Sequence, residues 1–195
     1  MTPLWIRLWH WVIAVLFAVL LVTGVVLTYS TAEFALMNYA LADRLHQVLG
    51  IAFSILFGLF VVVAGVSGYW RRYLRQSQGL GTRIHLHGSN VVAGAAVAQE
   101  EGREGKSRVE LSRGLLFLVQ QLLSIVSVAV LSPLLVVTGI ALLFPELVPT
   151  EILGADGLWA FALAHYWVGL AGALFLLFHA YIATVGGLKR MIRGR

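Results

Sequence analysis

The sequence contains no cysteine, and this absence excludes several kinds of redox and structural chemistry. Without thiols the chain forms no disulfide, ligates no iron–sulfur cluster through cysteine, and lacks the Cys-x-x-Cys-His motif that attaches c-type haem. Charged residues are scarce as well: they make up 12% of the 195 residues, while hydrophobic residues make up 59% and the mean hydropathy is +0.87. Because soluble domains contain about twice as many charged residues, these proportions exclude an ordinary soluble protein.

Four long stretches of the chain contain no Asp, Glu, Lys or Arg. They have 25, 26, 32 and 32 residues and cover 8–32, 45–70, 114–145 and 157–188. Each exceeds the length of about 20 residues that a helix needs to cross the hydrocarbon core. The first stretch is too long for the apolar part of a secretory signal, and no small-residue cleavage site follows it. We therefore predict an all-α integral membrane fold, a bundle of four transmembrane helices forming one domain over 1–195.

The basic residues predict the orientation of these helices. Every Lys and Arg except Arg44 lies at the N-terminus, in the loop 71–113 or in the C-terminal tail, whereas 33–44 and 146–156 contain five acidic residues. The positive-inside rule then places both termini and the long loop in the cytoplasm. We expect a multi-pass protein of the bacterial cytoplasmic (inner) membrane, surrounded by lipid. We interpret the net charge of +5 as a topology signal and expect no nucleic-acid partner.

Histidines inside the uncharged stretches are the candidate functional residues. His165 and His179 are 14 residues apart, which in a helix corresponds to about 21 Å along the axis and an offset of about 40°. One helix face would thus carry an imidazole near each surface of a core roughly 30 Å thick. The predicted topology places His46 at the outer depth with His165, and His10 at the inner depth with His179.

Imidazoles within a membrane need partners, and such residues are commonly functional. Two imidazoles at one depth can ligate the iron of a flat macrocycle from opposite sides, between helices of a bundle. We therefore predict two non-covalent haems b, one bound by His46 and His165 and the other by His10 and His179. For a single histidine at a helix end, the alternative is an interfacial group bonded to water or headgroups. The match of all four in depth favours the haem interpretation.

Glycines near the histidines are candidate cofactor contacts. Gly50 and Gly169 each follow an outer histidine by four residues, so they share its helix face. Without a side chain, they would leave room for a macrocycle stacked against the helix. Gly172 lies seven residues from both His165 and His179 and would face the space between the two haems. Ordinary small-residue helix packing is an equally good interpretation of these glycines.

Basic side chains near the helix ends can bind haem propionates. Arg7 is a candidate at the inner side, together with Lys189, and Arg44 is the candidate at the outer side. The alternative is that these side chains only anchor the helices at the membrane surface. This alternative is weaker for Arg44, because Arg44 departs from the positive-inside distribution. His85 and His87 lie in the loop 71–113, where we interpret them as solvated side chains and not as metal ligands.

Short motifs along the four stretches carry a resemblance to a known family. They comprise Arg7, His10 and Trp11 with Thr23 and Gly24; Arg44 and His46 with Gly50; Ser132 and Pro133 with Thr138, Gly139 and Pro145; and the spacing of His165 and His179. In these residues the chain resembles the di-haem cytochrome b membrane subunits of formate dehydrogenases, nickel-iron hydrogenases and thiosulfate reductases. The resemblance covers all four helices but not 76–113. It implies that the four histidines bind two b-type haems, with a quinone near the inner haem and an extracytoplasmic catalytic subunit at the outer one.

The sequence departs from this family where the third helix begins. Many members have an Asn there, followed shortly by Gln and Lys, polar groups associated with the quinone region. The corresponding stretch here is Phe117-Leu118-Val119-Gln120-Gln121, in which the Asn is absent and the Lys is replaced by Gln. Gln120 and Gln121 are therefore the candidates for quinone binding in this stretch. Lys189 is a further candidate, because it lies at the basic inner surface, where it could stabilise a semiquinone.

Together these observations predict an electron-transfer protein. We expect a di-haem subunit that passes electrons between an extracytoplasmic redox partner and membrane quinone, within a larger oxidoreductase. The resemblance implies a periplasmic or membrane-attached partner containing molybdopterin, iron–sulfur clusters or cytochrome c. One alternative is a stand-alone haem quinone oxidoreductase. Another is a transporter or metal-ion channel with a histidine-lined path, which the lack of intramembrane Asp and Glu disfavours.

Overall fold

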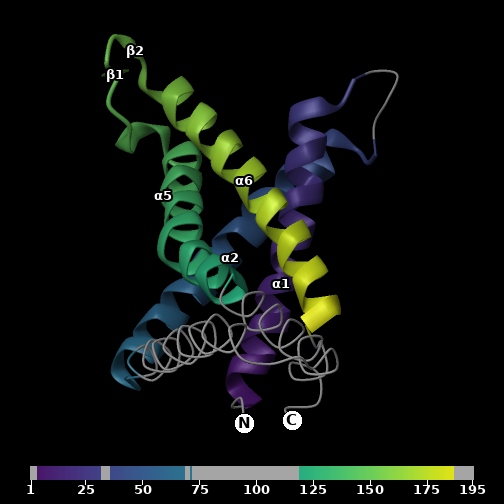
Figure 1. Cartoon of the computed structure of the whole chain (residues 1–195). Helices are drawn as coiled ribbons and strands as arrows, with labels where there is room; N and C mark the ends of the chain where they lie inside the picture. The colour runs from purple at the N-terminus through teal and green to yellow at the C-terminus, as the bar shows by residue number, and fades with distance from the viewer. Residues whose placement is uncertain (1–3, 32–35, 69–70, 72–118, 187–195) are drawn as a thin grey trace, which may run out of the picture.

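Four long apolar helices form the part of the chain that the computed structural model describes, residues 4–31, 36–68, 71 and 119–186 (Figure 1). They are α1 (Leu4–Tyr29), α2 (Tyr39–Val66), a third helix over Val119–Leu143, and α6 (Gly157–Gly186). Each is long and apolar enough to cross a membrane. The predicted all-α fold with four transmembrane helices is therefore confirmed.

Two helices begin before the uncharged stretches that predicted them. α1 already contains Arg7, and α2 contains Asp43 and Arg44 in its first two turns. Asn38 caps α2, since its side-chain oxygen accepts a hydrogen bond of 3.1 Å from the backbone N–H of Leu41. Charged side chains near a helix end can reach the membrane surface. The limits of the uncharged stretches therefore do not mark the starts of these two helices.

The third helix is locally widened near its middle. Ser127–Leu131 forms the π-helical turn η1, and α5 continues from it over Ser132–Leu143. Pro133 lies at the start of α5, and its missing N–H and its ring disturb the regular hydrogen-bond ladder of the preceding turn. A wider turn is a known accommodation of such a residue. The helix thus crosses the membrane without a break, but with a defect at Pro133.

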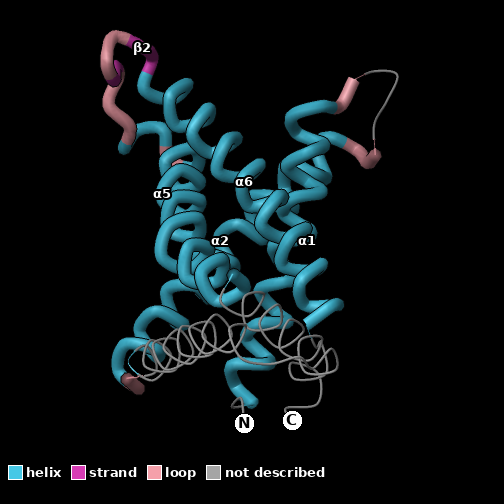
Figure 2. The backbone as a smooth tube through the Cα atoms, in the orientation of Figure 1, coloured by secondary structure: helices cyan, strands magenta, loops and turns pink. Residues whose placement is uncertain are grey.

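The helices are organised as two antiparallel hairpins, α1 with α2 and α5 with α6. Packing is denser within each hairpin than between them, where α2 and α5 provide the main contact. In Figures 1 and 2, the start of α1 and the ends of α2 and α6 lie at the lower end, and the connections within the hairpins lie at the upper end. We call the upper end the outer end and the lower end the inner end, following the predicted orientation.

The connection between α5 and α6 is itself ordered. It consists of the short 3-10 helix η2 (Pro145–Leu147) and the antiparallel strands β1 (Glu151–Ile152) and β2 (Ala155–Asp156). Gly157, the first residue of α6, lies so close to this connection that an added Cβ would be 1.8 Å from the carbonyl oxygen of Pro149. Only glycine fits there, and this close contact fixes where α6 begins.

Aromatic side chains pack between α1 and α2. Trp9 stacks on Phe60 with ring centres 3.9 Å apart, and Phe17 lies 6.2 Å from Phe53. On the other faces, many large apolar side chains are exposed. Exposed apolar surface on all four spanning helices is the arrangement expected of a protein surrounded by lipid.

Candidate functional site

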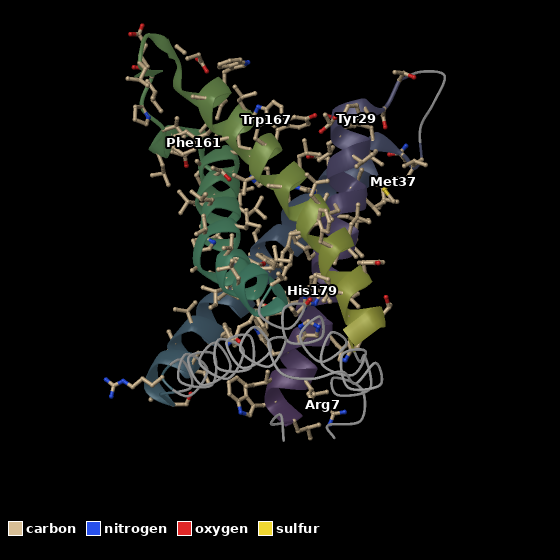
Figure 3. The ribbon with its side chains drawn as sticks, viewed as in Figure 1. Arg7, Tyr29, Met37, Phe161, Trp167 and His179 are labelled. Carbon is tan, nitrogen blue, oxygen red and sulfur yellow. The ribbon has the colours of Figure 1, made fainter. Side chains whose placement is uncertain are left out.

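The structure brings the four histidines together in the two pairs that depth predicts. The ring centres of His10 and His179 are 5.8 Å apart, and those of His46 and His165 are 6.2 Å apart. Each pair joins the two hairpins, because one member comes from α1 or α2 and the other from α6. Figure 3 shows His179 in the lower half of the molecule, on the side where Arg7 lies. We call His10 and His179 the inner pair, and His46 and His165 the outer pair.

Both rings of the outer pair are held by buried threonines. Thr23 Oγ1, on α1, lies 2.9 Å from Nδ1 of His46, and Thr138 Oγ1, on α5, lies 2.7 Å from Nδ1 of His165. Each hydroxyl also bonds to the backbone carbonyl four residues earlier in its own helix, at 3.0 Å for Thr23 and 2.6 Å for Thr138. Each threonine thus links its own helix backbone to a histidine on the neighbouring helix of the same hairpin.

The two threonine contacts are compatible with one tautomer of the outer histidines. When each hydroxyl donates its single proton to the backbone carbonyl of its helix, the hydroxyl oxygen accepts from an Nδ1–H of the imidazole. In that arrangement Nε2 keeps its lone pair in both rings. This is the tautomer in which a neutral histidine binds a metal through Nε2.

Glycines that follow the two threonines complete the contact with the outer rings. A Cβ added to Gly24 would lie 3.5 Å from Cε1 of His46, and one added to Gly139 would lie 3.4 Å from Cε1 of His165. We call Thr23 with Gly24, and Thr138 with Gly139, the two Thr–Gly pairs. The same arrangement therefore occurs twice, once in each hairpin.

The inner pair has a different hydrogen-bond partner. Nε2 of Gln120 lies 2.7 Å from Nδ1 of His179, and Oε1 of Gln120 is buried with no hydrogen-bond partner among the described residues. If His179 binds a metal through Nε2, its Nδ1–H is a donor, and the amide turned by 180° would present Oε1 to it. In either orientation, the other end of the amide is buried without a hydrogen-bond partner among the described residues.

The predicted glycines have different surroundings. A Cβ added to Gly50 or Gly169 would have no atom within 4 Å, so there is open space beside both outer histidines. Gly172 instead is buried against α1, since a Cβ added there would lie 2.8 Å from Cζ of Phe17. Gly172 therefore allows the ring of Phe17 to approach α6 midway between His165 and His179.

The remaining predicted residues lie at the ends of the helices or outside the described chain. Arg7 is half-buried at the inner end, Arg44 is exposed at the outer end two residues before His46, and Gln121 is buried. Lys189 lies outside the described residues, as do His85 and His87 with the rest of 72–113.

The two histidine pairs fit a haem bound through two axial imidazoles. Imidazoles on opposite sides of one metal ion, each with its nitrogen about 2 Å away, have ring centres roughly 6 Å apart. The separations of 5.8 and 6.2 Å agree with this value. In the outer pair, the threonine hydroxyls lie at Nδ1, which leaves Nε2 of each ring for a metal. Open space at Gly50 and Gly169 is compatible with a macrocycle beside the outer rings.

Comparison with known proteins identifies the family of the chain. The family model described as prokaryotic cytochrome b561 matches residues 2–194, a span that contains all four histidines and both Thr–Gly pairs. Neither a curated protein nor a solved structure gives a significant match. The family match confirms the resemblance to membrane cytochrome b subunits, and with four spanning helices it makes the chain a multi-pass membrane protein that binds haem b and transfers electrons. The chain belongs to the prokaryotic cytochrome b561 family.

Proposed function

We propose that this protein carries two haems b and passes electrons between an extracytoplasmic redox partner and the membrane quinone pool. The observation that carries the proposal is the presence of two histidine pairs, each with the ring separation of an axial bis-imidazole site. Haem held by these histidines would supply one-electron transfer. His165 and His179 are 14 residues apart on α6, so the two sites are about 21 Å apart along that helix.

In the outer site, two threonines would orient the proposed ligands. The hydroxyls of Thr23 and Thr138 lie 2.9 and 2.7 Å from Nδ1 of His46 and His165, which leaves Nε2 of each ring for the iron. Arg44 is exposed at the same end, and we assign it to a haem propionate. Gly50 and Gly169 would leave space for the macrocycle.

The outer end is also where we place the redox partner. Glu146, Glu151 and Asp156 are exposed on the connection between α5 and α6. An acidic surface of this kind favours docking of a protein with a basic face. The positive-inside distribution of Lys and Arg favours an orientation with this end outside the bacterial inner membrane. A periplasmic or membrane-attached subunit containing molybdopterin, iron–sulfur clusters or cytochrome c is the kind of partner we propose.

We place the quinone at the inner pair. One end of the Gln120 amide bonds to His179, and the other end is buried without a partner among the described residues. That second end can hydrogen-bond a quinone carbonyl or a quinol hydroxyl, depending on the orientation of the amide. Gln121 is the neighbouring buried amide, and Lys189, outside the described residues, remains a candidate by its position after α6. Arg7, half-buried at this end, is our candidate for the inner propionates.

Haem stoichiometry tests the proposal directly. The pyridine haemochrome of the purified protein should show two non-covalent haems b per chain, and dithionite should reduce both. A content of one haem or none would contradict the assignment of two ligand pairs. Solubilisation from native membranes in mild detergent separates the subunit role from a stand-alone quinone oxidoreductase, since only the former predicts a co-purifying redox protein.

The loop histidines provide a second test of the ligand assignment. Replacing both His85 and His87 with Ala should leave the haem content and the reduced spectrum unchanged, because the four proposed ligands all come from membrane helices. Optical spectra and pyridine haemochrome of the double variant provide the measurement. Loss of either haem would show that the loop contributes a ligand.

A further inference from the structure

The outer histidines share an arrangement that a simple packing role does not require. Each ring lies beside a Thr–Gly pair on the neighbouring helix, with the threonine hydroxyl at Nδ1 and the position of a Cβ added to the glycine at van der Waals distance from Cε1. The two pairs lie on different helices, α1 and α5, yet they meet the two rings at the same atoms. Thr23 and Thr138 are also buried, at 0% and 5% exposure. Both contacts are therefore shielded from water.

The direction of these hydrogen bonds affects the electron density of the ring. An Nδ1–H that donates to a fixed acceptor makes the imidazole a stronger electron donor at Nε2. A stronger donor stabilises ferric over ferrous iron, so the reduction potential falls. When His46 and His165 bind a metal through Nε2, each threonine hydroxyl accepts from Nδ1–H, and its own proton is left for a backbone carbonyl of its helix. If the hydroxyl rotated to donate its proton to Nδ1 instead, its hydrogen bond to the backbone carbonyl would be lost.

We propose that Thr23 and Thr138 are positioning residues that hold His46 and His165 as the Nδ1–H tautomer and thereby lower the reduction potential of the outer haem. This inference rests on the proposed function, in which these two histidines ligate iron. It assigns the tuning of the outer site to two residues that do not touch the iron.

Valine variants test the hydroxyl with little change in the shape of the side chain. In Thr23→Val and Thr138→Val, the acceptor at Nδ1 is lost, but the branched side chain that fills the site is retained. A potentiometric titration should show the outer haem shifted to a higher potential in each variant. We expect a roughly three- to tenfold change in its reduction equilibrium constant, or about 30 to 60 mV for a one-electron couple. The double variant should shift further, and the inner haem should keep its potential.

Three controls make the result specific. Thr28 is exposed, and its hydroxyl also bonds to a carbonyl of α1, at 2.9 Å from the Gly24 oxygen. In Thr28→Val, the potentials of both haems should therefore remain at the wild-type values. Thr23→Ser and Thr138→Ser keep the acceptor and should restore the wild-type potential. The outer haem is identified independently as the component that disappears in His165→Ala.

Each outcome of the titration supports or overturns the tuning role. Variants that keep two haems at unchanged potentials would overturn it while leaving the proposed function intact. Equal shifts of both haems, or shifts that serine does not reverse, would indicate general loosening and also overturn it. If the valine variants lose the outer haem, retention of that haem at its normal potential in the serine variants supports the proposal, and its loss there overturns it. A wild-type protein without two haems would refute the proposed function itself.

Discussion

In the His165→Ala variant, the haem b content of the purified protein should fall from two per chain to one. His165 faces His46 across 6.2 Å between ring centres, and without it the outer iron would keep only one protein ligand. Loss of contacts that merely orient a metal ligand costs roughly 10- to 100-fold in affinity, so loss of a ligand itself should empty the site during purification. Pyridine haemochrome and the amplitude of the reduced α-band measure this effect.

The reciprocal variant establishes which haem is lost. His179→Ala should also leave one haem, but the retained component should have the potential of the outer site and not that of the inner site. Tyr166→Phe is a matched control beside His165, because it removes only the hydroxyl that bonds to Tyr29 at 2.5 Å. It should retain both haems. If His165→Ala kept two haems, or if both histidine variants lost the same component, the pairing would be wrong.

Quinone turnover by the intact complex should move charge across the membrane. If electrons enter at the outer pair and leave at the inner pair, they travel about 21 Å of a core roughly 30 Å thick. That is about two-thirds of the membrane potential, or about 1.6 kcal/mol per electron at 100 mV. The equilibrium of the transfer should then change by about 15-fold for each 100 mV.

Proteoliposomes that contain the whole complex provide the measurement. Turnover should generate a potential that a voltage-sensitive dye reports, and a potential imposed with potassium and valinomycin should change the turnover rate. Collapse of the potential with an ionophore is the control and should abolish both responses. Electrically silent turnover that does not respond to an imposed potential would place the quinone at the outer end instead.

The sequence predicted the helices and the pairing of the histidines because both depend only on the lengths of segments and on residue spacing along the chain. The lack of charge over about 20 residues or more defines a membrane span, and the alignment of His165 with His179 follows from their 14-residue spacing and helix geometry. Depth alone then leaves one way to pair four imidazoles. The predicted helix starts were less accurate. α1 begins before Arg7 and α2 begins before Asp43, because a charge near a helix end does not terminate the helix.

The threonine contacts could not be predicted in the same way. Threonine in a membrane helix usually bonds to the carbonyl four residues earlier, so Thr23 and Thr138 have a sufficient partner within their own helices. Whether their hydroxyls also reach a histidine depends on the rotation of α1 against α2, and of α5 against α6, which no residue spacing specifies. The signal that the sequence did contain was the repetition of a Thr–Gly dipeptide in the helix directly before each outer histidine.

Gln120 shows a second limit of sequence reasoning. Its place near the start of the third helix implied a quinone role, but its amide nitrogen lies 2.7 Å from Nδ1 of His179. A polar residue in a membrane helix is satisfied by the nearest polar group, and here that group is a proposed haem ligand. The π-helical turn beside Pro133 was not predicted either, although the missing N–H and the ring of a proline account for it.

The division of the bundle into two hairpins has a consequence for how the protein is assembled in the cell. Each histidine pair takes one member from α1 or α2 and the other from α6, while packing between the hairpins is sparse. A group that binds both members of a pair favours the joined state of the two halves by mass action. Haem binding would therefore stabilise the association of the two hairpins during biogenesis. The hairpins could insert into the membrane one after the other and associate tightly only once haem is bound. Cells starved of haem should then accumulate an inserted but loosely joined chain that membrane proteases degrade.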